Sequence, residues 1–276
     1  MGKIIAIVNQ KGGVGKTTTS INLAAAFAAM KRRVMLIDLD PQGNATVGSG
    51  IDKSHFTATT SDVLLQEAEL EKIICKTQGG YDLLPADHDL IVAEVQLMQA
   101  TQREFRLKQI LQPILDDYDY ILIDCPPSLN ILTLNALVAA HSVLIPVQCE
   151  YFALEGLKGL LSTVEQIQTT INPELHIEGL LRTMYDGRNR LALDVSAQLL
   201  QHFPNRVYRT VIPRNVRLAE APSHGLPVLQ YDEKSQGAVA YLTLAGEMLR
   251  RVDEAGLSEP RASASVTALP DGRGSD

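Results

Sequence analysis

A glycine-rich segment near the start of the chain constrains the fold more than any other feature of the sequence. Residues 11–18 read Lys-Gly-Gly-Val-Gly-Lys-Thr-Thr, after an apolar run that begins at Lys3 and at the start of an alanine-rich helical pattern from Thr17 to Met30. Glycines let successive backbone N–H groups turn toward an anion, and the following helix adds the positive end of its dipole. The order strand, loop, helix therefore predicts a phosphate-binding loop.

The two lysines of this loop carry different expectations. Lys16 would place a mobile positive charge on the β- and γ-phosphates of a nucleotide, and the Thr17 hydroxyl would bind Mg²⁺. Lys11 stands outside the ordinary G-x-x-x-x-G-K-[ST] pattern, and because two neighbouring ammonium groups repel each other, a dense anionic ligand is needed to hold both. The alternative for Lys11 is a solvated surface side chain. The predicted nucleotide-binding residues of the loop are Lys11, Gly12, Gly13, Val14, Gly15, Lys16, Thr17 and Thr18.

Further apolar runs follow at the spacing of βαβ units, and most are hydrophobic on consecutive residues. Strands of a parallel sheet that is covered by helices on both faces show this pattern. A stripe of apolar residues between Leu154 and Ile171 predicts one covering helix. We therefore predict an α/β fold: a single P-loop NTPase domain with a mostly parallel, twisted sheet flanked by helices on both faces. The predicted strands span residues 3–9, 33–39, 81–84, 118–124, 142–147 and 176–183.

Length and composition set the limits of this domain. The chain has 276 residues, of which 45% are hydrophobic, and residues 1–253 fit one large α/β domain. Residues 254–276 are rich in Gly, Pro, Ser and Ala and are predicted to be a disordered tail. The segment from Pro41 to Thr60 has no clear period and is predicted to be a long functional loop. Three scattered cysteines favour a reducing, cytoplasmic compartment, and no apolar run is long enough to span a membrane.

Aspartates end two of the predicted strands. Asp38 and Asp40 end or follow the strand that begins at Arg33, and Asp124 ends the strand Tyr-Ile-Leu-Ile-Asp. The C-terminal ends of parallel strands lie at the edge of the sheet where ligands bind. A buried strand that ends in Asp is a weak pattern alone, but after a phosphate loop it predicts the carboxylate that holds Mg²⁺. Asp40 lies closer to the loop and to solvent than Asp38, and the alternative for both is a structural carboxylate at a strand end.

Two levels of resemblance to known proteins appear in these residues. Residues 11–17 resemble the deviant Walker A motif of the MinD/ParA group of P-loop ATPases. Residues 146–156, 183–186 and 212–225 resemble chromosomal ParA (Soj-type) partition ATPases in particular. The resemblance extends from residue 1 to about residue 252. It implies that the chain binds ATP and Mg²⁺, hydrolyses ATP and forms a homodimer with ATP.

The resemblance also implies roles for single residues. Lys11 would reach across the dimer interface to the phosphates on the partner subunit. Asp40 would orient the attacking water and contact the Mg²⁺ shell. By the same resemblance, the catalytic residues are Lys11, Lys16 and Asp40, the metal ligands are Thr17, Asp40 and Asp124, and the residues on the adenine side are Met184, Pro213 and Asn215.

The formal net charge of −7 conceals a basic segment. From Arg182 to Arg217 the chain has seven arginines and two aspartates, which is a local charge of +5. An arginine-rich surface fits contact with the phosphate backbone of DNA without recognition of bases. In the resembled family, arginines matching Arg188 and Arg217 bind double-stranded DNA nonspecifically in the ATP-bound dimer, and Arg214 is a further predicted DNA contact. The alternative is that these arginines are salt-bridged surface residues.

The expected function is that of a switch ATPase which segregates a chromosome or a plasmid together with a ParB-type centromere-binding protein, in the cytoplasm and at the nucleoid. The alternative is a MinD-like ATPase that positions the division site or another cargo. Membrane cycling of that kind needs a basic amphipathic C-terminal helix. The last predicted helix, from Ser235 to Val252, has an apolar stripe typical of core packing, so we expect no membrane partner. A structural role without hydrolysis is disfavoured by Asp40 and Asp124.

Overall fold

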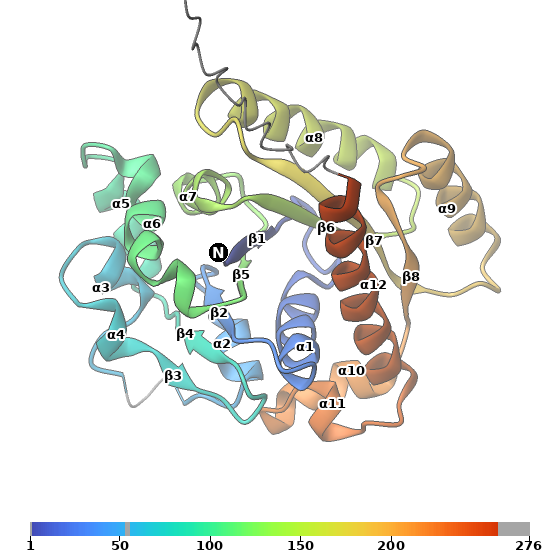
Figure 1. The fold of residues 1–276 in the computed structure, drawn as a ribbon, viewed down its shortest axis with the longest axis horizontal. Helices are drawn as coiled ribbons and strands as arrows, with labels where there is room; N and C mark the ends of the chain where they lie inside the picture. Colours follow the sequence, from blue (N-terminus) through green and yellow to red (C-terminus); the bar gives the residue numbers. More distant parts are fainter. Residues whose placement is uncertain (1, 53–55, 259–276) are drawn as a thin grey trace, which may run out of the picture.

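An eight-stranded sheet forms the centre of the molecule in the computed structural model, which describes residues 2–52 and 56–258 (Figure 1). The strand order is β3-β4-β2-β5-β1-β6-β7-β8, and neighbouring strands are parallel except β3 and β4. The predicted mostly parallel sheet is therefore confirmed. The strands are Lys3–Ile7 (β1), Val34–Asp38 (β2), Cys75–Lys76 (β3), Asp82–Leu84 (β4), Tyr120–Asp124 (β5), Ser142–Gln148 (β6), His176–Tyr185 (β7) and Val207–Pro213 (β8).

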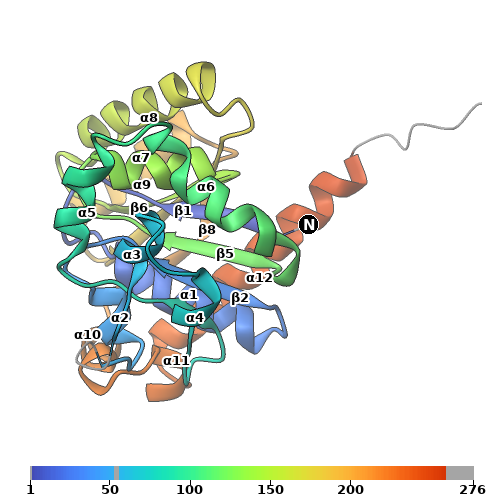
Figure 2. The same ribbon diagram turned by 90° about the vertical axis from the view of Figure 1, so that its left-hand side faces the viewer.

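Helices cover both faces of the sheet, which explains why the strands are apolar on consecutive residues. In β1, Ile4 and Ala6 belong to one buried core, while Ile5 and Ile7 belong to the core on the other face. Helices α7 and α8 pack on the first face, and α1 and α12 pack on the second (Figure 2). These four helices span Ile131–Ala139 (α7), Ala153–Thr170 (α8), Lys16–Ala29 (α1) and Gln236–Ser258 (α12).

Shorter helices fill the connections between these elements. They are α2 (Asn44–Gly48), α3 (Thr60–Leu64), α4 (Leu70–Ile73), α5 (Leu90–Leu97), α6 (Arg106–Leu111), α9 (Arg190–His202), α10 (Val216–Glu220) and α11 (Val228–Tyr231). The 3₁₀ helices are η2 (Arg103–Phe105), η3 (Gln112–Asp117) and η4 (Ala221–His224). No helix in the described part of the chain is both long and apolar enough to cross a membrane.

The apolar pattern of the sequence does not predict β8, for a physical reason. β8 is the last strand of the sheet, and Arg209 within it is exposed, so an uninterrupted apolar run is absent. Glu247 of α12 accepts hydrogen bonds from the backbone N–H groups of Arg209 and Thr210, both at 2.9 Å. A carboxylate on the neighbouring helix thus satisfies donors that a further strand would otherwise pair.

Two segments differ from the predicted organisation. The predicted loop from Pro41 to Thr60 contains the short helix α2, because the buried Asp38 carboxylate accepts the Thr46 backbone N–H and hydroxyl groups, both at 2.8 Å. At the other end of the chain, α12 continues to Ser258, so residues 254–258 of the predicted tail are helical. The rest of the predicted tail, residues 259–276, lies outside the described residues.

Candidate active site

The sheet topology brings the predicted loop and the predicted carboxylates to one edge. β5 lies between β1 and β2, and Asp124 at its end is in register with Ile7 on one side and Asp38 on the other. The phosphate loop follows β1 directly, and Asp40 lies just beyond β2. The residues predicted to meet phosphate and metal therefore come from three adjacent strand ends, where ligands bind in open parallel sheets.

The backbone of the loop is shaped for close approach of a ligand. Gly13 and Gly15 have φ angles of +74° and +87°, in the left-handed region that favours glycine. A Cβ atom added at Gly12 or Gly13 would meet no atom within 4 Å. Gly15 is also the N-cap of α1 and has no side-chain cap, so the first N–H groups of this helix are available to an anion.

Lys16 is the first residue of α1, directly after this loop, and it is buried. Its ammonium group donates to the carbonyl oxygen of Lys11 at 3.4 Å. Burial lowers the pKa of Lys16, and the carboxylates of Asp124 and Asp40 oppose that shift. A phosphate bound on the loop would favour the charged form of this lysine in the same way as the carboxylates do.

Asp124 is fully buried, and only one of its oxygen atoms is hydrogen-bonded. Oδ1 accepts a bond from Ser20 Oγ at 2.8 Å, and the Thr17 hydroxyl also bonds to the carboxylate. Oδ2 has no hydrogen-bond partner among the described residues. Burial, followed by repulsion from Asp38, raises the pKa of Asp124. An unpaired carboxylate oxygen beside a threonine hydroxyl fits Mg²⁺, which prefers hard oxygen ligands.

The two aspartates after β2 have different surroundings. Asp38 is fully buried, and besides Thr46 it accepts the backbone N–H of Asp40 at 3.1 Å, so its carboxylate holds local structure together. Asp40 is partly exposed, and its Oδ1 accepts the backbone N–H of Gln42 at 3.0 Å. The structural role of a strand-end carboxylate thus belongs to Asp38, and Asp40 stays the candidate for orienting water.

A metal at this edge would need ligands beyond the protein carboxylates. In residues 2–52 and 56–258, no three His, Cys, Asp or Glu side chains are grouped so that they could hold a metal ion. Thr17, Asp40 and Asp124 would therefore share the metal with oxygen atoms of a bound phosphate and of water, which is the usual arrangement for Mg²⁺.

A pocket of about 190 Å³ adjoins the phosphate loop and contains the three residues predicted on the adenine side. Met184, Pro213 and Asn215 come from the ends of β7 and β8, and they meet Gly15 and Thr18 of the loop and α1. Asn215 Oδ1 is buried and has no hydrogen-bond partner in the described part of the chain. Asn215 thus lines a mostly apolar pocket and carries a buried oxygen atom that is unpaired among the described residues. Its other lining residues are Thr183, Ile212, Arg214, Leu218, Ala219 and Tyr241.

Two of these lining residues are additions that the sequence patterns do not predict. Thr183 Oγ1 donates to the carbonyl oxygen of Val14 at 2.8 Å, which ties the end of β7 to the phosphate loop. The Tyr241 hydroxyl lies 3.1 Å from Thr19 Oγ1, which joins α12 to α1. Thr183 begins one of the stretches that carry the family resemblance, so a signal for it exists. Tyr241 has none, because α12 reaches the pocket only through tertiary packing.

Lys11 is engaged within its own chain. Its Nζ atom lies 2.5 Å from Glu150 Oε2, in the loop between β6 and α8, and both side chains are about half exposed. Exposed ion pairs of this kind contribute little stability, so the lysine can exchange Glu150 for a stronger anion. In the single chain, the Lys11 side chain is thus neither unpaired at the surface nor bound to the phosphate loop, because it pairs with Glu150.

The basic segment does not form one surface, contrary to its local charge count. Arg182 is buried and donates to Ser196 Oγ and to the carbonyl oxygen atoms of Tyr208 and Arg209. Arg206 precedes β8 and therefore lies at the end of the sheet opposite to the phosphate loop. The local charge of +5 therefore overestimates the positive charge that a single ligand could contact, because these arginines, although close in sequence, lie at both ends of the same strands.

The three predicted DNA contacts remain near the C-terminal edge of the sheet. Arg188 follows β7 and Arg214 follows β8, and these strand ends are adjacent because Tyr185 is in register with Pro213. In the described part of the chain, Arg214 has no ion pair within 4.0 Å. The other two are salt-bridged: Arg188 with Asp186 at 2.9 Å, and Arg217 with Glu220 at 2.8 Å and Asp232 at 3.2 Å.

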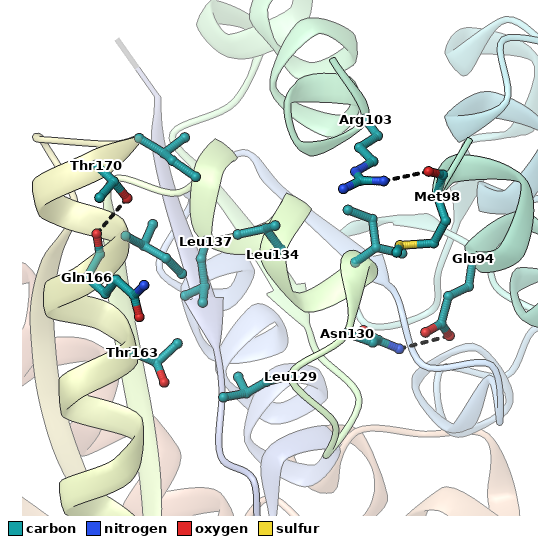
Figure 3. Close-up of a pocket in the computed structure, with 13 residues that line it drawn as sticks. Glu94, Met98, Arg103, Leu129, Asn130, Leu134, Leu137, Thr163, Gln166 and Thr170 are labelled. Carbon is teal, nitrogen blue, oxygen red and sulfur yellow. Dashed lines mark hydrogen bonds between the residues drawn. The ribbon is translucent and has the colours of Figure 1, made fainter. Parts of the chain in front are cut away.

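A second hollow, of about 630 Å³, lies apart from these residues between α5, α7 and α8 (Figure 3). Its walls are mostly apolar, with Glu94 and Arg103 on one side and the α8 residues Thr163, Gln166 and Thr170 on the other. No residue predicted for nucleotide, metal or DNA binding lines it. It therefore takes no part in the candidate active site.

Comparisons with known proteins agree with this geometry. A protein-family model described as an AAA domain matches residues 2–177. The chain is 54% identical over 249 residues to the sporulation initiation inhibitor protein Soj of Bacillus subtilis, covering 90% of this chain and 98% of that protein. It is 50% identical over 252 residues to the chromosome partitioning protein ParA of Myxococcus xanthus, covering 91% of this chain and 89% of that protein.

Solved structures with the same fold include a Mycobacterium smegmatis protein described as cobyrinic acid a,c-diamide synthase with bound ADP and magnesium. It is 38% identical, has a TM-score of 0.82, and the match covers 92% of this chain and 97% of that one. The cell division ATPase MinD of Pyrococcus furiosus is 29% identical with a TM-score of 0.74, and the match covers 91% of this chain and all of that one. Since the family model matches more than half of the chain and the Soj and ParA relatives match nearly all of it, the chain belongs to the ParA/Soj-type chromosome-partitioning ATPases.

Proposed function

We propose that this partitioning ATPase is an ATP-dependent dimerising switch that binds double-stranded DNA nonspecifically in its ATP state. With a ParB-type centromere-binding partner, it would segregate a chromosome or a plasmid at the nucleoid. The observation that carries the proposal is the continuity of the site: the phosphate loop, the buried Asp124 and the pocket at Asn215 lie side by side at one sheet edge. The bound ADP and magnesium of the Mycobacterium smegmatis structure support ATP and Mg²⁺ as the ligands.

In this proposal, ATP lies along the edge with its phosphates on the loop and its adenine in the pocket. Asn215 Oδ1 would accept a hydrogen bond from the exocyclic amine of adenine, because that oxygen is otherwise an unpaired buried acceptor. Buried polar atoms without partners are unfavourable, so a ligand that supplies the missing donor is bound in preference to one that does not. This arrangement favours adenine over guanine, whose corresponding position is a carbonyl oxygen.

Hydrolysis would need no covalent intermediate. The loop N–H groups and Lys16 would hold the terminal phosphate, Thr17 and Asp124 would hold Mg²⁺, and Asp40 would orient a water molecule for in-line attack. When bound, Mg²⁺ supplies positive charge that stabilises the charge spread over the phosphate oxygen atoms. Loss of the γ-phosphate would release the segments that follow Asp40 and Asp124, which is a common way for a nucleotide to switch a protein between states.

The homodimer and DNA binding extend this cycle beyond one chain. Lys11 would leave Glu150 and contact the phosphates on the partner subunit. Arg188, Arg214 and Arg217 would contact the DNA backbone, with phosphates replacing the carboxylates that are paired with Arg188 and Arg217. Such pairs contribute little stability, so their replacement by phosphate is favourable when several contacts form together.

The test is DNA binding of the full chain with ATP, with ADP and without nucleotide. We expect strong DNA binding with ATP but not with ADP or without nucleotide. With ATP, Arg188→Glu and Arg217→Glu should bind DNA more weakly than the wild type, and their binding should depend less on salt. ATP turnover should rise when DNA and a ParB-type partner are both added. Equal DNA affinity in all three nucleotide states, or turnover that is unchanged with both partners, would contradict the proposal. Binding to phospholipid vesicles in place of DNA would favour the MinD-like alternative.

A further inference from the structure

The end of β7 is irregular where it contacts the phosphate loop. Toward β6, the register of β7 is continuous as far as Thr183. Toward β8, Arg182 is paired with Val211 and Tyr185 with Pro213, so β7 advances by three residues while β8 advances by two. β7 therefore holds one extra residue at this point, as in a β-bulge. Bulges redirect side chains and are frequent next to active sites.

The backbone of Met184 has an unfavourable conformation at this bulge. Its φ angle of +47° lies in the left-handed region, which is costly for a residue with a Cβ atom. Such a conformation persists only where the surrounding structure requires it, and it is often found at functional sites. A Cβ atom added at Gly15 would lie 3.8 Å from Thr183 Cβ and from Met184 Cε. Both side chains of the bulge therefore lie against the phosphate loop.

The Thr183 hydroxyl forms a buried hydrogen bond with this loop. Leu181 belongs to the core on the face of α1 and α12, and strand alternation places Thr183 on the same face. Thr183 is buried, and its Oγ1 donates to the carbonyl oxygen of Val14 at 2.8 Å. Val14 precedes Gly15, the N-cap of α1, so its carbonyl lies before the hydrogen-bond ladder of the helix. A buried carbonyl at this position needs a partner from outside the helix, and β7 supplies it.

This bond also fixes the direction of a backbone donor. The Val14 carbonyl and the Gly15 N–H belong to one peptide unit, and the described residues contain no cis peptide bond. In a trans peptide these two groups point in opposite directions. Holding the carbonyl toward β7 thus turns the Gly15 N–H away from β7. Glycine adopts φ angles of either sign at similar cost, so this peptide would otherwise be free to rotate.

We infer that Thr183 is a positioning residue of this ATPase. Its bond to Val14 holds the Gly15 N–H in the orientation that donates to a nucleotide phosphate. The inference rests on the proposed binding of phosphate by this loop, and Thr183 acts through the peptide unit instead of touching the phosphate. Valine has nearly the same shape as threonine but no donor. Thr183→Val should therefore keep the packing and release the peptide.

The experiment measures dissociation constants of the full chain by competition with a fluorescent ATP analogue and Mg²⁺. ATP, tripolyphosphate and adenosine are the competitors, up to millimolar concentrations. We expect Thr183→Val to weaken binding of ATP and of tripolyphosphate about tenfold, because an aligned donor to a charged group is lost. Adenosine has no phosphate, so its affinity should change less than about threefold. Thr183→Ser keeps the hydroxyl and should bind ATP within about threefold of the wild type.

Thr77→Val is the matched control. The partly buried Thr77 also donates its Oγ1 to a backbone carbonyl oxygen, that of Tyr81 at 2.6 Å. This bond lies before β4, at the end of the sheet opposite to the phosphate loop. Thr77→Val should bind all three competitors like the wild type. Thermal unfolding shows whether each variant is folded, and Thr183→Ala replaces Thr183→Val if the valine variant is not.

The outcomes separate this inference from the proposed site. Wild-type affinity for ATP in the variant without the hydroxyl overturns the inference. Equal losses for ATP and adenosine also overturn it, because Thr183 would then shape the whole pocket and not the phosphate loop. A serine variant as weak as the valine variant has the same consequence. Lys16→Ala that binds ATP like the wild type would instead overturn the proposed phosphate site itself, whatever the Thr183 variants do.

Discussion

Replacing Asp186 by asparagine is expected to strengthen the proposed binding of DNA. Asp186 Oδ1 and Oδ2 accept hydrogen bonds from Nε and Nη2 of Arg188, both at 2.9 Å. Every phosphate contact of Arg188 must therefore compete with this carboxylate. In Asp186→Asn the competing charge is gone, while the asparagine oxygen can still accept the Arg188 backbone N–H that Asp186 accepts at 3.0 Å.

The size of the effect follows from the exposure of the pair. The Arg188 side chain is 91% exposed, so solvent screens its ion pair and the competition is weak. We expect the DNA affinity of Asp186→Asn to rise about two- to fivefold at moderate salt. If Arg188 gains a phosphate contact, the log–log dependence on salt should steepen by about 0.9 for that contact.

Fluorescence anisotropy with a labelled duplex, ATP and a series of salt concentrations measures both quantities. Asp194→Asn is the matched control, because Asp194 is an exposed aspartate of the same basic segment. It removes the same charge without releasing Arg188. The bond from Arg188 lowers the pKa of Asp186 to about 2, so Asp186 is ionised at all pH values used, and the effect should be the same at about pH 6 and pH 8.

Equal affinities of Asp186→Asn and the wild type would refute the idea that this carboxylate competes with DNA. An equal gain in Asp186→Asn and Asp194→Asn would also refute it, because net charge would then explain the whole effect. Weaker binding by Asp186→Asn would mean that the bridge orients Arg188 for DNA.

Three further predictions concern the nucleotide site and the fold. Asp40→Ala should lower ATP turnover about 100-fold or more while an ATP-bound dimer still forms, as measured by phosphate release and sedimentation; a monomer with ATP would contradict the role in orienting water. Asn215→Ala should weaken ATP binding about tenfold in calorimetry and leave GTP binding unchanged, because only adenine presents an amine to the lost oxygen. Gly50→Ala and Gly80→Ala share a φ of +80°, so each should destabilise the chain by about 1–2 kcal/mol in urea unfolding. Gly50→Ala should lower the free energy of unfolding more than Gly80→Ala does, because the added Cβ at position 50 would lie 2.6 Å from Gly225 O, whereas the one at position 80 would have its nearest neighbour at 3.6 Å. Equal losses of stability would contradict this close packing.

The central fold and the phosphate loop are predictable from the sequence because local patterns encode them. Strands that are buried on both faces must be apolar on consecutive residues, and β1 and β5 show this run clearly. Gly13 and Gly15 encode a left-handed backbone that other residues do not adopt easily. Each of these signals is contained in a few consecutive residues, so no knowledge of distant segments is needed to recognise it.

Edge elements and short helices give much weaker local signals. β8 has the exposed Arg209 in its centre because it borders no further strand. Helix α2 forms in a segment without periodicity because the Asp38 carboxylate binds Thr46. In both cases, contacts outside the segment itself stabilise its backbone, so propensity and apolar pattern alone do not predict it.

Which charges and polar groups meet is decided by the tertiary structure. Lys11 and Glu150 are 139 positions apart and meet because β1 and β6 are neighbours in the sheet. The basic segment is continuous in sequence, yet it splits between the two ends of β7 and β8, with Arg182 buried between them. Local sequence specifies how each segment folds and which residue types can bind phosphate or metal. Strand order then specifies which of these residues share an edge, because a parallel sheet joins strand ends that are far apart in the chain.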